Sequence, residues 1–399
     1  MWSAVYLEYL VQGWDALICR VALNCARRFS VPPLLSPQFY LFIYEDRRKL
    51  LDFGTFMEFH DRPGRSQAED FAEGWRQVDL AESAGMDAIW MAESHFTPER
   101  AVLTSLMAVG SAIAARTERV TIGTAVQVLP LTDPMRMAEE TATLDQISEG
   151  RFEFGIGRSG SPAAYDGYGI DYSTSSERTF EDLEIIKGLW TNERFSYKGK
   201  FHSYDNVCLV PKPVQSPHPP LRMAANSEAS FPVVGKLDLP LFIGVRQHGT
   251  ERVEKYVDSY QKARKEAGFD GPPDVSIRIP VYISESREEA ERVPEHTFMK
   301  QFRRLGGQIA VTVGRADVAQ DSERASRTAE LANLEWGSVM REKVVVGTPE
   351  MVIDRIHELK ERLKLTSIVA EFNAGEEISE SDIERSMRLM CDKVMPAFK

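Results

Sequence analysis

The feature that most constrains the fold of this chain is a regular alternation of short apolar segments with amphipathic ones, from about residue 50 to the C-terminus. The apolar segments are bounded by turn residues, which is typical of strands, and segments with helical spacing lie between them. Parallel strands need crossover connections, usually helices, so the alternation predicts a parallel sheet. The eight expected strands are residues 50–56, 86–92, 120–129, 151–157, 221–225, 239–244, 275–283 and 366–373.

Eight strand–helix units predict an α/β fold of the (β/α)8 or TIM-barrel type. An open doubly wound sheet is the alternative, and the lack of a Gly-x-Gly-x-x-Gly motif after the first strand counts against it. We expect the barrel domain to span residues 49–399. A hairpin with a proline-rich loop is expected at 195–220, and a lid-like insertion at about 285–342. Residues 1–48 are expected to form an extension outside the fold.

Three helix boundaries are explicit in the sequence. Gly85 is expected to end the helix that follows the first strand, because glycine adopts the left-handed conformation at a helix C-terminus. Asp133 is expected to cap the helix that begins at Pro134. Thr174 and Glu177 have the spacing of a capping box for the next helix along the chain.

Composition limits the partners of the protein. The formal net charge is -12, and no run of basic residues exceeds the three at 47–49, so we expect no nucleic-acid partner. No segment reaches the roughly 18 apolar residues of a membrane span. The four cysteines form no Cys-x-x-Cys motif and do not cluster with histidines, which favours reduced thiols in a cytoplasmic protein without a metal site.

Polar residues gather where the expected strands end, and in a barrel the chemistry lies at the carboxyl ends of the strands. Glu93, Ser94 and His95 end the second strand. The loop after the fourth strand contains Arg158 between glycines and hydroxyls, and such a loop can bind an anion through backbone N–H groups. The segment 226–230 after the fifth strand places serines where a helix would begin, which favours phosphate binding. An ordinary turn and an ordinary helix cap are the alternatives, but together the two loops predict a phosphorylated cofactor.

Four stretches carry a resemblance to a known family: AGMDAIWMAESHF, ERVTIGTAVQVLPLTDPMRMAEETATLDQISEGRFEFGIGRSG, MAANSEAS and VVGTPEMVIDRI. With them the chain resembles the bacterial luciferase-like flavin-dependent monooxygenases from about residue 50 to residue 397. The resemblance implies a TIM-barrel enzyme that uses reduced FMN and oxygen to oxygenate a small organic substrate. It also implies a separate flavin reductase as a partner and, since such barrels commonly pair, a homodimer.

The resemblance also implies roles for particular residues. The FMN phosphate is expected near Arg158, Arg178, Ser227 and Ser230. A non-proline cis peptide bond is expected under the flavin ring, at Ala125–Val126.

Two positions depart from luciferase proper. Ser94 stands where luciferase has its catalytic histidine, with His95 next to it, and Gly157 stands where luciferase has a reactive cysteine near the flavin. Light emission from an aldehyde is therefore not expected. Ser94 and His95 are the candidate catalytic residues, the latter because the ordinary pKa of histidine suits proton transfer near neutral pH. A structural His95 hydrogen-bonded to Glu93 is the alternative.

The substrate is expected to contact the lid-like insertion and three aromatic side chains, those of Phe59, Tyr165 and Tyr168. Two further functions stay open from the sequence. The first is hydride transfer with a deazaflavin in place of FMN, as in related barrels. The second is a non-catalytic flavin-binding barrel, because the luciferase histidine is replaced at Ser94.

Overall fold

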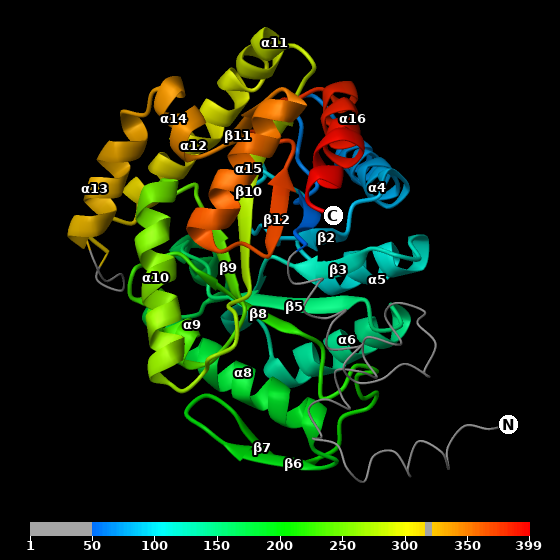
Figure 1. The fold of residues 1–399 in the computed structure, drawn as a ribbon. Coiled ribbons are helices and arrows are strands. Elements are labelled where there is room, and N and C mark those ends of the chain that lie inside the picture. Colours follow the sequence, from blue (N-terminus) through cyan, green and yellow to red (C-terminus); the bar gives the residue numbers. More distant parts are fainter. Residues whose placement is uncertain (1–49, 316–320) are drawn as a thin grey trace, which may run out of the picture. The chain divides into compact units, whose positions relative to one another are not determined.

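Eight parallel strands close into a barrel surrounded by helices in the computed structural model of the chain (Figure 1). The structure describes residues 50–315 and 321–399, and the expected extension 1–48 lies outside the described residues. Residues 52–397 form one compact unit. The barrel confirms the predicted (β/α)8 class.

The barrel strands follow one another in the order β1-β2-β3-β5-β8-β9-β10-β12, and β12 pairs with β1 to complete the circle. Every pair of neighbours in this circle is parallel, so all the carboxyl ends lie at one mouth. The strand bounds are β1 Asp52–Met57, β2 Ala88–Met91, β3 Thr121–Thr124, β5 Phe152–Gly157, β8 Leu221–Ala225, β9 Leu241–Gly244, β10 Val275–Ile283 and β12 Ser367–Glu371.

The third expected strand, residues 120–129, is not continuous. It is divided into β3 and β4 (Gln127–Val128), and the peptide bond Ala125–Val126 between them is cis. The strand pairs with β5 at Gly123↔Glu153 and again at Gln127↔Ile156. Between these two pairings the third strand advances by four residues while β5 advances by three. This extra residue in one strand explains why an unbroken strand was the wrong prediction.

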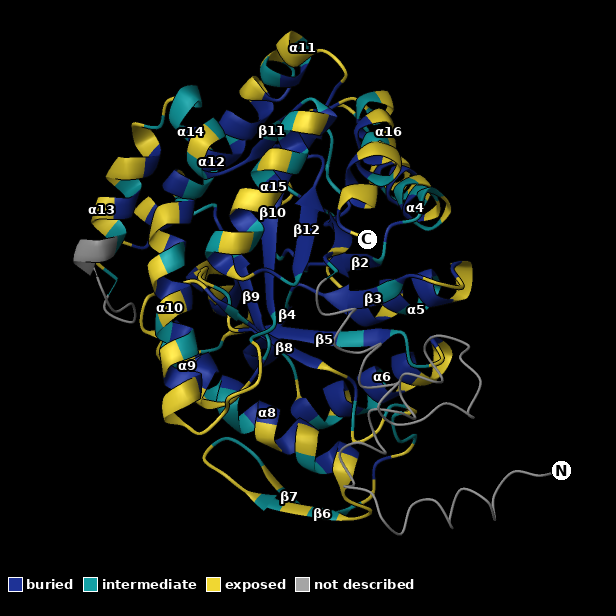
Figure 2. Cartoon of the chain, viewed as in Figure 1, coloured by how far each residue is buried: buried dark blue, intermediate teal, exposed yellow. Residues whose placement is uncertain are grey.

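Helices cover the outside of the barrel, with their buried sides on the strands and their exposed sides toward solvent (Figure 2). The helix that follows each strand in turn confirms the predicted alternation. The bounds of these helices are α4 Gln67–Ala84, α5 Leu106–Arg116, α6 Pro134–Ile147, α7 Pro162–Tyr168, α8 Ser175–Thr191, α9 Ser230–Lys236, α10 Thr250–Glu266, α15 Pro349–Leu363 and α16 Glu380–Leu389. Short turns lie at Leu129–Leu131, Tyr172–Thr174, Met390–Val394 and Met395–Ala397. Among the described residues, no helix is both long and apolar enough to cross a membrane.

Both expected insertions contain secondary structure. The first contains the antiparallel hairpin of β6 (Phe195–Lys198) and β7 (Ser203–Val207), as predicted. The second connects β10 to β12 and contains α11 Arg287–Arg292, α12 Glu295–Ala310, α13 Asp321–Ala332, α14 Trp336–Glu342 and β11 Val345–Gly347. Since β11 pairs with the far end of β10, this insertion extends the wall of the barrel on one side.

Two of the three predicted helix boundaries are confirmed. Gly85 has a φ of 100° and ends α4, and the side chain of Asp133 accepts a hydrogen bond from the backbone N–H of Arg136 at the start of α6.

The capping box at Thr174 was a wrong prediction, because that side chain makes no capping hydrogen bond to α8. Its hydroxyl donates to the carbonyl oxygen of Asp171 at 2.7 Å and accepts from Nε of Arg178 at 3.1 Å. Glu177 contacts Lys200 of the hairpin instead. A 3-10 turn at Tyr172–Thr174 leads directly into α8, so Thr174 at the N-cap position has a helical backbone (φ -84°, ψ -5°) in place of the extended one that a capping side chain needs.

The inside of the barrel is packed around the ring of Trp90, which is 3% exposed. A Cβ on Gly54 would lie 2.6 Å from this ring, and a Cβ on Gly123 would lie 2.3 Å from it. Glycine at these two positions of β1 and β3 therefore makes room for the indole. Trp90 packs in a cluster with Phe56 and Phe242 that fills the barrel below its mouth.

Candidate active site

A cavity of about 220 Å³ lies at the mouth where the strands have their carboxyl ends. Seven of the eight barrel strands, or the loops directly after them, contribute to its wall, and α12 of the second insertion adds three residues. The cavity is lined by Glu58, Ala92, Glu93, Arg100, Ala125, Val126, Val128, Ser159, Gly160, Ser161, Ala224, Asn226, Phe242, Ile243, Gly244, Arg246, Gln247, Arg278, Leu305, Gln308 and Ile309.

The two residues joined by the cis bond, Ala125 and Val126, both line the cavity. Gly157 lies beside them, since a Cβ added to this glycine would come within 2.7 Å of Cγ2 of Val126. The position that holds a cysteine in luciferase is thus filled here by the side chain of a neighbour. The cis bond that the resemblance implied at Ala125–Val126 is present.

Glu93 fixes the chain that follows the cis bond. Its carboxylate accepts a hydrogen bond from Nε2 of Gln127 at 2.7 Å and from the backbone N–H of Val128 at 2.6 Å. The side chain is 3% exposed, and burial raises the pKa of Glu93. Glu93 therefore serves both as a wall of the cavity and as an anchor for the segment after Val126.

His95 and Ser94 lie next to this carboxylate. Nε2 of His95 is 3.6 Å from Oε2 of Glu93, and its Nδ1 is 3.4 Å from the hydroxyl of Tyr168. Ser94 is buried, and its backbone N–H donates to the carbonyl oxygen of Leu103 at 2.9 Å. Neither Ser94 nor His95 is among the residues that line the cavity. The geometry thus connects His95 to the cavity through Glu93.

Two arginines expected near the phosphate meet the same end of α8. A guanidinium nitrogen of Arg158 donates to the hydroxyl of Ser175 at 3.3 Å, and Nε of Arg178 donates to Thr174 at 3.1 Å. The Arg178 guanidinium also lies 4.2 Å from the centre of the Phe201 ring. The structure therefore brings both arginines to the start of one helix.

The two expected serines bond to one another. The hydroxyl of Ser230 donates to the carbonyl oxygen of Ser227 at 2.6 Å, and the backbone N–H of Ser227 donates back at 3.2 Å. Their neighbour Asn226 and the segment 159–161 next to Arg158 line the same cavity. The two predicted loops thus meet at one mouth.

The three aromatic candidates for substrate contact do not line this cavity. Phe59 is 3% exposed and packs edge-on against Phe71 and Trp75 of α4. Tyr165 is fully buried, and its hydroxyl donates to the carbonyl oxygen of Arg158. Tyr168 is 46% exposed and lies with its ring edge-on to His95, at 5.3 Å between ring centres. Tyr165 therefore supports the loop that contains Arg158, and Phe59 belongs to the packing of α4.

Sequence reasoning assigned no role to a set of charges at the mouth, of which Glu58, Arg278 and Glu371 are buried and Arg100 and Arg246 are half-buried. A signal was present, because Arg278 and Glu371 interrupt strands that are otherwise apolar. Residues of this kind are almost never buried unless they are paired.

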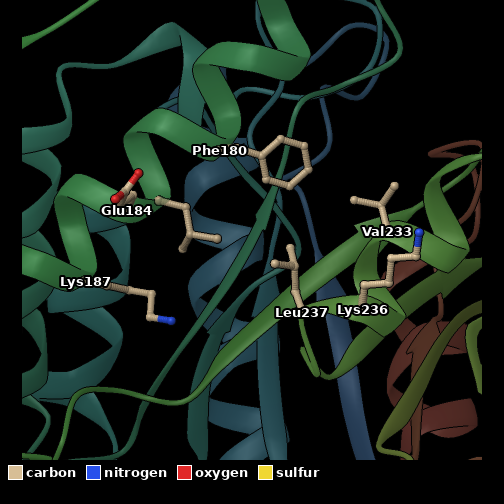
Figure 3. Close-up of a pocket in the computed structure, with 7 residues that line it drawn as sticks. Phe180, Glu184, Lys187, Val233, Lys236 and Leu237 are labelled. Atoms are coloured by element: carbon tan, nitrogen blue, oxygen red, sulfur yellow. The ribbon is translucent and has the colours of Figure 1, made fainter. Parts of the chain in front are cut away.

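A second hollow, of about 560 Å³, lies outside the barrel between α8 and α9 (Figure 3). Its wall combines Phe180, Leu183 and Leu237 with the charged ends of Glu184, Lys187 and Lys236, and with Val233. No strand end contributes to this wall, so the hollow is not a candidate for the barrel's chemistry. Among the described residues, no group of three or more histidine, cysteine, aspartate or glutamate side chains is arranged to hold a metal ion.

Comparison with known proteins agrees with this architecture. The family model described as luciferase-like monooxygenase matches residues 51–365. The chain is 25% identical to the oxygenase component of a flavin-dependent trigonelline monooxygenase from Acinetobacter baylyi, over 84% of this chain and 91% of that one. It is 35% identical over 181 residues, 45% of its length, to an uncharacterized protein of Sinorhizobium fredii, and spans about half (52%) of that relative.

Solved structures share the fold. The oxygenating constituent of 3,6-diketocamphane monooxygenase from Pseudomonas putida, in complex with FMN, matches with a TM-score of 0.72 and 20% identity, over 87% of this chain and 98% of that one. The coenzyme F420-dependent tetrahydromethanopterin reductase from Methanopyrus kandleri matches with a TM-score of 0.65 and 20% identity, over 88% and 100%. The same barrel thus occurs in proteins that differ in their cofactor.

Proposed function

This chain belongs to the luciferase-like monooxygenase family and is an oxidoreductase, and we propose that it is the oxygenase component of a two-component monooxygenase. It takes reduced FMN from a separate flavin reductase and uses oxygen to oxygenate a small organic substrate. The observation that carries the proposal is the mouth cavity, where the cis-linked pair Ala125–Val126 lines the same space as Asn226 and the segment 159–161.

The lining of this cavity suits a flat ring with one apolar face and a polar edge. Ala92, Ala125, Val126 and Phe242 supply apolar surface. Asn226 and other polar residues supply donors and acceptors around it. A flavin ring has both characters, so the residues present fit the cofactor.

The residues of the chain hold the cofactor and exclude water from it. We propose that Arg158, Arg178, Ser227 and Ser230 bind the phosphate, and that Ala125 and Val126 support the ring. When bound, reduced FMN supplies the electrons that activate oxygen. Residues of α12 close the cavity from the side of the insertion, which limits the access of water.

Ser94 and His95 are the proposed catalytic residues. Burial raises the pKa of Glu93, and its Oε2 lies 3.6 Å from Nε2 of His95. We propose that His95 acts on the cavity through Glu93, which forms part of its wall. Ser94 is buried one residue away and offers a hydroxyl for a hydrogen bond.

An anaerobic titration tests the proposal. The protein is titrated with reduced FMN and with reduced F420, a deazaflavin, and oxygen is then admitted in the presence of a substrate panel and a flavin reductase. We expect saturable binding of reduced FMN and an oxygen-dependent loss of substrate. Preferential binding of the deazaflavin would indicate hydride transfer instead, and tight FMN binding without any turnover would favour a non-catalytic barrel.

Arginine variants, compared in the same titration, test the proposed phosphate site. Arg158→Ala and Arg178→Ala should each weaken reduced-FMN binding by about tenfold or more, because each removes a charge-assisted hydrogen bond to the phosphate. Arg136→Ala is the matched control, since this arginine is 69% exposed on α6 and, within residues 50–315 and 321–399, its side chain pairs only with Glu139 and Glu140 of its own helix. A loss of affinity in all three variants alike would argue against a phosphate site at the start of α8.

The proposal includes two further features, the first implied by the resemblance and the second by the pattern of cysteines. The first is a homodimer in solution, which a measurement of molar mass tests directly. The second is a cytoplasmic location, where a reductase can supply reduced flavin. The cysteines of the described residues, Cys208 and Cys391, are free thiols.

A further inference from the structure

At the mouth cavity the arginines outnumber the carboxylates that pair with them, since the lining carboxylate of Glu93 is bound to Gln127 and to the backbone of Val128 instead. Three arginines and two glutamates meet there from different elements. Glu58 follows β1, Arg100 precedes α5, Arg246 follows β9, Arg278 lies in β10, and Glu371 ends β12. All of them except Glu371 line the cavity.

Two of the arginines form ion pairs with the two carboxylates. Arg100 binds Glu58 through two hydrogen bonds, with Nε at 2.9 Å from Oε2. Arg278 binds Glu371 through two hydrogen bonds of 3.0 and 2.7 Å, and it lies 3.7 Å from Glu58. Gln301 of α12 donates to Glu371 at 2.6 Å. The two carboxylates are 1% and 0% exposed, so no solvent shares in this pairing.

Arg246 is the arginine that remains. Its side chain makes no hydrogen bond and no salt bridge with any residue in the described parts of the chain. Burial, and the like charges of Arg278 and Arg100, lower the pKa of Arg246. A guanidinium nevertheless stays protonated in proteins. The half-buried guanidinium of Arg246 therefore lines the cavity without a hydrogen-bond acceptor among the described residues, so its donors are available to a ligand that enters there.

The surroundings of Arg246 indicate what the ligand looks like. Phe242 and Ile243 of β9 line the cavity, as do Leu305 and Ile309 of α12. A molecule that fits this space needs an apolar body and one negative charge. The planar guanidinium matches a carboxylate through two parallel hydrogen bonds.

We propose that the organic substrate of this enzyme carries a carboxylate group on an apolar body, and that Arg246 binds this carboxylate. The proposal rests on the proposed function, since it names the substrate class for the same cavity. Arg246 then determines specificity, because a neutral analogue of the same shape leaves the guanidinium without a partner.

Binding of small model acids to the full-length protein tests the proposal. The probes are benzoate and hexanoate, each compared with its own amide, benzamide or hexanamide, by calorimetry with and without reduced FMN under anaerobic conditions. We expect at least one acid to bind about tenfold to a hundredfold more tightly than its amide. Arg246→Gln should abolish this preference and Arg246→Lys should reduce it, whereas Arg136→Gln should leave it unchanged.

Stability separates a ligand-binding arginine from a structural one. Removal of an uncompensated charge should leave the Tm of the ligand-free Arg246→Gln protein unchanged or higher. A clear fall in its Tm would show that the guanidinium has a structural partner and would overturn the proposal. The proposal is also overturned if neither acid binds better than its amide, or if the preference for the acid persists in Arg246→Gln.

Reduced FMN serves as the second readout. If Arg246→Gln loses affinity for reduced FMN and the wild-type protein shows no preference for acids, Arg246 binds the flavin, which overturns the carboxylate site but leaves the proposed function intact. If the wild-type protein binds no reduced FMN yet prefers an acid through Arg246, the carboxylate site stands and the proposed function fails.

Discussion

Gly157 and Val126 should be strongly coupled in stability, and substitution of Gly157 by alanine tests this coupling. The glycine lies at the end of β5, and its φ is not in the left-handed region, so alanine is compatible with its backbone. The new Cβ would approach Cγ2 of Val126 to 2.7 Å, whereas its contact with Ala224 would be an ordinary 3.5 Å. The conflict is therefore with one side chain only.

The size of the effect follows from two opposing contributions. Alanine in place of glycine stabilises a compatible position by about 0.4–1 kcal/mol, because the unfolded chain loses conformational freedom. Overpacking of a filled site costs about 1–3 kcal/mol. Gly157→Ala should therefore destabilise the wild-type protein by about 1–2 kcal/mol. In a Val126→Ala background the clash is removed, and the same substitution should be neutral or slightly stabilising.

Urea unfolding of the four proteins in this double-mutant cycle, without flavin, measures the coupling. We expect an interaction of about 2 kcal/mol between the two positions. Gly160→Ala is the control, because no atom lies within 4 Å of a Cβ at that position. Additive effects of the two substitutions, within about 0.5 kcal/mol, would refute the argument that Val126 fills the space beside Gly157.

Two further predictions concern buried polar groups at the same mouth. Burial lowers the pKa of His248 to about 4, so the stability contributed by its neutral ring is complete above pH 6.5 and is lost as the pH falls from 6.5 to 4, by at most about 3 kcal/mol. His248→Gln should flatten this decline in urea unfolding measured across that range, and an unchanged slope would contradict the assignment. Glu93→Ala leaves the amide of Gln127 and the N–H of Val128 without an acceptor and should cost about 3 kcal/mol, with weaker binding of reduced FMN. Glu93→Gln retains one acceptor and should cost about half as much; equal losses would indicate that the charge of Glu93 matters more than its hydrogen bonds.

The fold was predictable from the sequence because it depends on a pattern that repeats eight times. All eight strands and the hairpin lie where apolar periodicity and turn residues place them. The two failures are local. The third strand is broken because a one-residue mismatch with β5 interrupts its ladder, and the Thr174 side chain makes no capping hydrogen bond because a 3-10 turn precedes the helix. Neither the mismatch nor the 3-10 turn changes the hydrophobic pattern from which strands and helices are read.

The candidate site was predictable where a residue's position along a strand decides its location. The loops that contain Arg158 and Ser227 meet because parallel strands end at one mouth. Aromatic side chains could not be assigned in this way. Phe59 follows β1 and Tyr165 lies in α7 after β5, yet one packs on α4 and the other supports a loop. Whether an aromatic ring lines a cavity or fills a core depends on packing across elements, which a linear pattern does not contain.

The charges at the mouth could not be interpreted from the sequence for a different reason. An arginine without a partner is recognised only after the other charges have been paired, and these come from strands that are distant in sequence. Arg278 interrupts an apolar strand and so signals a partner, but only the structure shows that the partner is Glu371, 93 residues away. Once this pair and the pair of Arg100 with Glu58 are identified, Arg246 is the arginine of this set without an acceptor among the described residues. The carboxyl ends of the strands thus form the proposed flavin site, whereas Arg246 and the residues of α12 line the remaining space of the cavity. Substrate choice in this protein should therefore change with substitutions at Arg246 and in α12, while affinity for the flavin should change with those at the ends of β3, β5 and β8.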